Sequence, residues 1–161
     1  MKIVLVVIIL VVAALFIVAA LIPKHHSASA SRVVRAAPAD VYALIRDVAS
    51  APQWRSDVTR VELLDGNRFR EHAKCGVVTY EIVDDKPSQS FATRIADKNL
   101  GYTGTWTYRL APENGSTRVT ITEDGEVSNL FFRFMSRFVF GYTTTMEKTL
   151  AAIAATCDTR R

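Results

Sequence analysis

Hydrophobic and polar residues follow three different patterns along the chain, and each pattern predicts a different element. Residues 3–22 are twenty consecutive apolar residues without a charge. Residues 58–127 alternate with a period of two, which is typical of strands with one buried face. Residues 128–157 carry apolar side chains every three or four positions, which is typical of an amphipathic helix. The chain therefore predicts an apolar N-terminal helix, a sheet, and a long C-terminal helix.

The C-terminal pattern predicts one continuous helix from Ser128 to Cys157, with Ser128 as its N-cap. Its apolar stripe contains Phe131, Phe134, Met135, Phe138, Tyr142, Thr145, Met146, Thr149 and Ile153. Arg133 and Arg137 fall on the polar side, and Phe140 lies beside them. An aromatic stripe of this kind most often packs in a core, and contact with a ligand is the alternative interpretation.

The period-two region predicts six strands. They are Val58 to Leu64, Arg68 to Cys75, Val77 to Val83, Ser90 to Asp97, Tyr102 to Leu110 and Thr117 to Val127. Short turns such as Asp65-Gly66-Asn67 separate them, so neighbouring strands should be antiparallel. A strand from Ser31 to Ala36 and two short helices, the second carrying Trp54 as a core residue, should precede them. The predicted fold is α+β, with a curved antiparallel seven-stranded sheet wrapped around the C-terminal helix.

Alternation also predicts which side chains face that helix. Tyr102, Trp106 and Tyr108 share one face of their strand, and Tyr80 should face the same way. Hydroxyls and carboxylates on an otherwise apolar face suit a cavity with a few polar anchors, although the hydroxyls could instead reach solvent at the sheet margin. The predicted ligand-binding residues are Glu71, Tyr80, Tyr102, Trp106, Tyr108, Glu123, Phe134, Phe138 and Tyr142.

The apolar N-terminal segment is long enough to cross a bilayer, because a helix rises about 1.5 Å per residue and the hydrocarbon core is roughly 30 Å thick. A cleaved signal peptide is the alternative, since Ala28-Ser29-Ala30 resembles a cleavage site. Signal peptides, however, have apolar regions of only about 7 to 15 residues. The predicted division is a membrane anchor at 1–23, a polar stalk at 24–30, a folded domain at 31–157 and a tail at 158–161. The side of the membrane that carries the domain stays open.

Composition and motifs exclude several functions. The formal net charge is +4, but basic residues are scattered among acids without a basic run, so we expect no nucleic-acid partner. The two cysteines, Cys75 and Cys157, form no CxxC motif. His72 and Cys75 lie three apart on a predicted strand and therefore face opposite sides. No nucleotide, hydrolase or metalloprotease motif is present, and we predict no catalytic residue, metal or cofactor.

The order of elements resembles the helix-grip fold of the SRPBCC superfamily. The resemblance rests on Ala37 to Asp47, on Pro52 to Val58 with Trp54, and on Phe131 to Leu150. That superfamily includes START lipid-transfer domains, birch pollen allergens, polyketide cyclases and coenzyme Q-binding proteins. The resemblance covers Ser31 to Thr156 and implies a hydrophobic ligand, but it transfers no catalytic residue, because the superfamily has no universal catalytic motif.

Three functions follow as hypotheses. The first is a membrane-anchored module that binds a lipid or another hydrophobic small molecule and has the bilayer as a partner. The second is a polyketide cyclase- or dehydratase-like enzyme that uses Glu71 or Glu123 as a general base. The third is a non-catalytic interaction domain at the membrane, with a filled core instead of a cavity.

Overall fold

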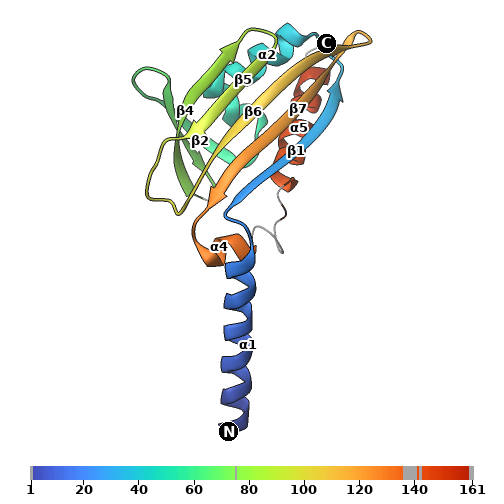
Figure 1. Cartoon of the computed structure of the whole chain (residues 1–161). Helices are drawn as coiled ribbons and strands as arrows, with labels where there is room; N and C mark the ends of the chain where they lie inside the picture. The colour runs from blue at the N-terminus through green and yellow to red at the C-terminus, as the bar shows by residue number, and fades with distance from the viewer. Residues whose placement is uncertain (1, 75, 136–140, 142, 160–161) are drawn as a thin grey trace.

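The computed structural model describes residues 2–74, 76–135, 141 and 143–159, and Figure 1 shows a curved sheet with a rod-like helix at one end. The side chains of residues 2, 11–15, 17, 19 and 132 also lie outside the description. The elements are α1 (Lys2–Leu21), β1 (His25–Val34), α2 (Pro38–Arg46), η1 (Val48–Ser50), α3 (Ala51–Trp54), β2 (Val58–Leu63), β3 (Arg68–Ala73), β4 (Gly76–Lys86), β5 (Ser90–Ile95), β6 (Tyr102–Glu113), β7 (Ser116–Val127), α4 (Leu130–Met135) and α5 (Thr144–Thr159).

The sheet confirms the predicted seven-stranded antiparallel arrangement. Its strand order is β1-β7-β6-β5-β4-β3-β2, so β2 to β7 form a meander and β1 is added at the edge beside β7. Period-two patterning and short turns fix this order, since each tight connection brings the next strand back beside the last. The predicted strand ends differ from the observed ones by a few residues; β4, for example, runs on to Lys86.

The expected stalk at 24–30 is wrong, because β1 begins at His25 and pairs with β7 from its first residue. His26, Ala28 and Ala30 are half-buried, and the serines between them are exposed. The segment looked like a linker because its residues are small and polar. Such residues suit an edge strand whose hydrogen bonds come from the backbone, so composition gave no strand signal.

The single helix predicted from Ser128 to Cys157 is also wrong. The described residues of this stretch form the separate helices α4 and α5, and Gly141 between them has a φ of +70°, outside the right-handed helical region. Asn129, not Ser128, caps α4, because its side-chain oxygen accepts a hydrogen bond from the Phe131 N–H at 2.9 Å. The predicted stripe residue Phe131 is 65% exposed.

Arg133 was expected on the polar side of the long helix, yet it is buried, with 4% of its surface exposed. Its guanidinium donates to three backbone carbonyls, those of Val127 at 3.1 Å, Ile22 at 3.1 Å and Ser128 at 3.2 Å. Arg133 therefore joins the end of α1, the end of β7 and α4. Phe140 and Arg137 lie outside the described residues.

Helix α1 projects from the sheet and contacts α4 at its base (Figure 1). Among the residues that the structure describes, no helix was found that is long and apolar enough to cross a membrane. The predicted span from Ile3 to Ile22 includes positions 11–15, 17 and 19, whose side chains are outside that description.

The buried core lies where α2 and α5 pack on the sheet. Met146, Leu150 and Ile153 of α5 are completely or almost completely buried and cluster with Val119 and Ile121 of β7. Helix α5 also extends through Thr159, so the tail predicted from residue 158 begins later than expected. The described helices contact β1, β5, β6 and β7, and η1 and α3 contact β2, whereas β3 and β4 are left less covered.

Candidate functional site

A cavity of about 470 Å³ lies on the concave side of the sheet. Its walls come from β3 to β7, from His26 at the start of β1, from α3 and the residues just after it, and from α2, η1 and the start of α5. This volume falls within the range of roughly 300–1,000 Å³ that is typical of small-molecule sites. The fold therefore has room for a ligand beside the packed core.

Six of the nine predicted ligand-binding residues line this cavity: Glu71, Tyr80, Tyr102, Trp106, Tyr108 and Glu123. Phe134 lies half-buried on α4 and is not among the described residues around the cavity. Phe138 and Tyr142 lie outside the described residues. For all nine residues, a role in binding a ligand stays a prediction.

Strand register brings the cavity residues together. Glu123 pairs with Trp106, and Trp106 pairs with Thr93, which places the three side chains in one row across β7, β6 and β5. In the next strands the rings of Phe69 and Tyr80 stack with centroids 5.4 Å apart. Side chains at paired positions share a face of the sheet, so alternation along the sequence was sufficient to predict this wall.

One end of the polar lining is an ion-pair cluster of Arg55, Asp57 and Glu71. Arg55 Nη1 donates to Glu71 Oε2 at 2.9 Å, and Nη2 donates to Glu71 Oε1 at 3.2 Å and to Asp57 Oδ2 at 2.6 Å. Arg55 Nε completes the cluster with a 3.4 Å bond to Asp57 Oδ1. Arg55 is thus engaged by two carboxylates, and both oxygens of Glu71 accept from it.

Burial and charge oppose each other in this cluster. Burial raises the pKa of Glu71, and the nearby Arg55 charge and hydrogen bonds reduce that rise without cancelling it. Burial also acts to raise the pKa of Asp57, but the hydrogen bonds and charge of Arg55 prevail and hold it below its usual value. Burial raises the pKa of Tyr108 to about 12, so its hydroxyl stays protonated at neutral pH.

The second polar region is a pair between strands β1 and β7. His26 Nε2 lies 3.5 Å from Glu123 Oε1, and both residues line the cavity. Gly125 pairs with His26 across the strands, and a Cβ there would lie 2.6 Å from His26 Cε1, so the glycine makes room for the imidazole. Among the described residues, no group of three or more His, Cys, Asp or Glu side chains could hold a metal ion.

Sequence reasoning did not assign Arg55, Asp57, Trp54 or His26 to the site. Arg55 and Asp57 were noted only within the family resemblance, Trp54 was expected in the core, and His26 was assigned to the stalk. Trp54 packs against the core, as expected, and also lines the cavity. Its Nε1 is the one buried side-chain polar atom without a hydrogen-bond partner in the described part of the chain. The partners of Arg55 and His26 lie far along the sequence, so no local pattern could reveal them; alternation within residues 25–30 was the only available signal for His26.

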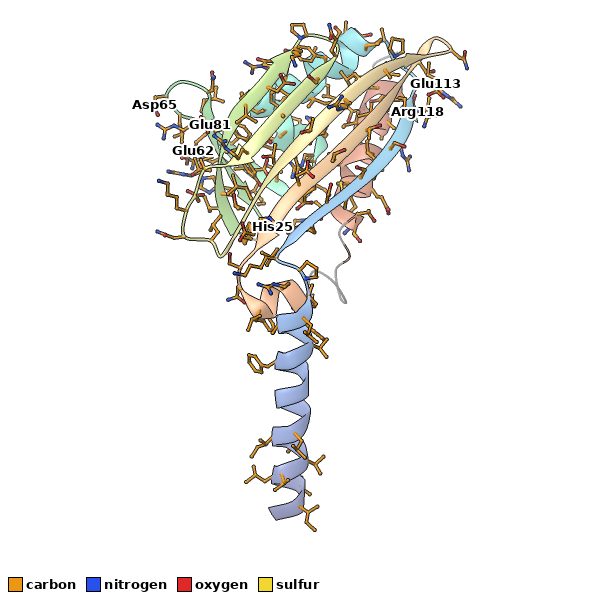
Figure 2. All side chains as sticks on the ribbon, in the orientation of Figure 1. His25, Glu62, Asp65, Glu81, Glu113 and Arg118 are labelled. Atoms are coloured by element: carbon orange, nitrogen blue, oxygen red, sulfur yellow. The ribbon has the colours of Figure 1, made fainter. Side chains whose placement is uncertain are left out.

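The cavity is more open at the end nearest α1. Its lining residues Tyr102, Thr103, Gly141 and Thr145 are exposed, whereas Phe91 and Tyr108 are buried. Tyr102 pairs with Val127, whose N–H donates to the Lys24 carbonyl at 2.9 Å just after α1. His25 marks this end of the sheet in Figure 2, and Glu113 and Arg118 mark the opposite end.

Solved structures show the same fold at low sequence identity. A START superfamily protein from Mycobacterium smegmatis superposes with a TM-score of 0.70 at 14% identity, covering 84% of this chain and 99% of that one. The Zhui aromatase/cyclase from Streptomyces sp. R1128 gives 0.71 at 16% identity, with 84% and 95% covered. Norcoclaurine synthase from Thalictrum flavum gives 0.66 at 11% identity, with 82% and 86% covered. The helix-grip fold expected from the sequence is therefore confirmed.

A search of curated proteins gave no match. The sequence does match the family described as polyketide cyclase/dehydrase and lipid transport, over residues 25–158. The match begins at the first residue of β1 and includes every strand of the sheet and helix α5 up to residue 158. This chain therefore belongs to the polyketide cyclase/dehydrase and lipid transport family.

Proposed function

We propose that the protein binds a lipid or another hydrophobic small molecule in the cavity. The observation that carries this proposal is the cavity itself, about 470 Å³ with Phe69, Tyr80, Trp106 and Tyr108 in its walls. Burial of apolar ligand surface contributes about 25 cal/mol per Å², which is enough to bind a small hydrophobic molecule against aromatic walls. The third hypothesis, an interaction domain with a filled core, does not account for this space.

Mass spectrometry of the purified full chain tests the proposal. Protein extracted in mild detergent should release a hydrophobic compound in stoichiometric amounts. Val78→Phe should reduce that amount at least tenfold, because Val78 lines the cavity and a phenyl ring would fill part of it. Val77→Phe is the matched control, since Val77 is the next residue on β4 and is 48% exposed. Absence of any bound compound, or equal loss in both variants, would contradict the proposal.

We further propose that α1 anchors the protein in a membrane, so that ligand passes between the bilayer and the cavity. The uncharged apolar sequence from Ile3 to Ile22 supports this, as do large exposed side chains such as Ile3, Leu10 and Phe16. The open end of the cavity, near the connection after α1, would then face the membrane surface. The side of the membrane is not assigned.

Alkaline carbonate extraction of membranes tests the anchor. The full chain should stay in the membrane pellet, and a variant with Ile8→Asp and Ile9→Asp should move to the supernatant, because each central charge costs about 2.5–3.5 kcal/mol of insertion. Intact mass spectrometry separates the anchor from a signal peptide. A mature protein that begins near residue 31 would overturn the anchor.

A second candidate function, acid–base catalysis, is favoured by the His26–Glu123 pair in the cavity wall. Glu71 is less suited to act as a base because both its oxygens accept hydrogen bonds from Arg55. Ring opening of 5-nitrobenzisoxazole measures an accessible base in an apolar site. The full chain should accelerate it, Glu123→Gln should lower the rate at least tenfold, and Glu126→Gln on the opposite face of β7 should not. Equal rates in all three proteins would remove this candidate.

A further inference from the structure

Helix α4 carries a buried charge and an exposed phenyl ring, which is the reverse of the pattern on a helix that faces water. Arg133 is 4% exposed, and Phe131 is 65% exposed. The two side chains lie about 200° apart around the helix axis, because an α-helix turns about 100° per residue. One side of α4 is therefore charged and buried, and the opposite side is apolar and exposed.

The contacts of Arg133 show which way each side of α4 faces. Its guanidinium donates to the carbonyls of Val127, at the end of β7, and of Ser128, which follows. Phe131 lies on the other side of α4 and therefore faces away from the sheet. Helix α1 contacts α4 and projects away from the sheet as well (Figure 1). The exposed ring thus lies on the side of α4 where a bilayer that holds α1 would be.

The position of α4 along α1 matches the end of the apolar segment. Arg133 Nη1 donates at 3.1 Å to the carbonyl of Ile22, the last residue of the apolar run 3–22. Pro23 and Lys24 follow, and Lys24 is exposed. In an anchored helix, charged residues begin where the hydrocarbon gives way to lipid headgroups. Helix α4 therefore lies at the depth of the membrane interface.

We propose that α4 docks on the surface of the bilayer that holds α1, with the Phe131 ring inserted at the boundary between headgroups and acyl chains. The inference rests on the proposed anchoring by α1 and adds a second contact with the same membrane. Interfacial helices bury their apolar side about 5–10 Å into this boundary. The apolar ring leaves water there, while Arg133 stays paired with the backbone inside the protein.

This contact also orients the open end of the cavity. The N–H groups of Ser128 and Asn129 donate to the Gly101 carbonyl at 3.0 Å and 3.3 Å, so the start of α4 is tied to the start of β6. Tyr102 is the next residue and lines the cavity at its exposed end. With α1 and α4 both on the membrane, the domain cannot tilt freely about α1, and Tyr102 stays near the lipid.

Fluorine NMR of the full chain in phosphatidylcholine nanodiscs tests the proposal. 4-Trifluoromethylphenylalanine replaces Phe131 in one sample and Leu63 in a matched control, because Leu63 is 67% exposed on β2. Figure 2 labels the nearby Glu62 and Asp65 on a part of the sheet remote from α1. A lipid with a nitroxide on its acyl chain should broaden the signal at 131 at least about fivefold more than the signal at 63, as expected for an interfacial depth. A gadolinium chelate in the water should do the reverse.

A second measurement places the same label at Tyr102 and tests the orientation of the domain. Phe131→Asp should reduce the broadening of this signal by the nitroxide lipid at least about twofold, because a carboxylate favours water over the interface. Leu63→Asp is the control and should leave the broadening unchanged. The chemical shift of the label without either reagent should be the same in both variants, which shows that the open end of the cavity keeps its fold.

The outcomes separate this inference from the anchor. If the chain stays in the discs but the lipid broadens the signals at 131 and 63 equally, the inference is overturned and the anchor stands. Protection of position 131 from both reagents would also overturn it, since a second copy of the chain would then cover the ring. An unchanged signal at 102 in Phe131→Asp would overturn the orienting role. A chain that does not assemble with the discs would refute the anchor, and the inference with it.

Discussion

Two arginines, Arg55 and Arg133, have largely buried side chains, but the chain satisfies them in different ways. Arg55 in the cavity wall is neutralised by Asp57 and Glu71. Arg133 at the base of the domain donates only to backbone carbonyls in the interactions seen among the described residues. The guanidinium has five N–H donors in a fixed fork, so it can serve either set.

The two arginines also hold different groups in place. Arg55 allows two carboxylates to lie beside aromatic rings at the cavity, because their charges are compensated there. Arg133 binds the carbonyl ends of three segments, Ile22 after α1, Val127 at the end of β7 and Ser128 before α4. Removing Arg55 therefore leaves buried charge, whereas removing Arg133 leaves uncharged carbonyls, buried or partly buried, without a donor.

The largest effect is expected from Arg55→Met. Breaking a buried pair by removing one partner costs about 3–5 kcal/mol, because Glu71 would remain buried without a cation. Chemical denaturation of the full chain in nanodiscs at pH 7 measures the free energy of unfolding. The double variant Arg55→Met with Glu71→Gln should recover part of the loss, since it removes the orphan charge. A double variant as unstable as the sum of the two single variants would show that the ion pair is not the cause.

A smaller loss is expected from Arg133→Met, about 1–3 kcal/mol, which is the cost of leaving buried acceptors unpaired. The effect should be local. Hydrogen exchange should rise at α4 and at the end of β7, while the β3–β4 pair keeps its protection. Arg133→Lys is the control, because an ammonium keeps the charge but cannot reach three carbonyls in the same fork geometry. If the lysine variant matched the wild type, charge alone would explain Arg133.

The sheet and the contacts of Arg133 differ in how well the sequence predicts them. The six-stranded meander and most of the cavity wall were predictable, because both depend on the period-two alternation within strands such as β6. Arg133 was placed on the wrong face because a helical wheel assumes one regular helix, whereas Gly141 has a φ of +70°, which a right-handed helix does not allow. Its partner Ile22 is 111 positions away. Contacts over such distances come from tertiary packing and leave no local pattern.

A pH titration should reveal the opposing pKa shifts in the Arg55 cluster. The folded-state pKa of Glu71 is raised above its ordinary value of 4.5, so the folded chain binds more protons than the unfolded chain just above pH 4.5. The contribution of Glu71 to stability should therefore fall as pH rises through this window. The difference in unfolding free energy between the wild type and Glu71→Gln, measured from pH 4 to 8, isolates it.

Asp57 provides the matched comparison because its shift has the opposite sign. Its folded-state pKa is held below its ordinary value of 3.8, so its contribution should be present above that pH and be lost on acidification below it. Comparison of the wild type with Asp57→Asn from pH 2 to 5 measures this loss. If the contributions of both residues to the unfolding free energy changed with pH in the same direction, the two pKa shifts would not have opposite signs. Burial would then not dominate at Glu71, or pairing with Arg55 would not dominate at Asp57.

The smallest effect is expected from Arg118→Met at the exposed end of the sheet, where Figure 2 shows Arg118 beside Glu113. Arg118 Nε and Nη2 donate to the two Glu113 oxygens at 2.6 Å and 2.8 Å, so this pair uses the same two donor atoms as Arg55 with Asp57. Its side chains are 46% and 32% exposed, and solvent screening limits such pairs to about 0.2–1 kcal/mol, less at high salt. Arg55 also binds a second carboxylate, so a difference in cost between Arg55→Met and Arg118→Met reflects burial together with that second partner. Equal losses of unfolding free energy in the two variants would instead show that the two-pronged geometry determines the stability of each pair. Burial of the charges in the cavity wall would then add nothing to it.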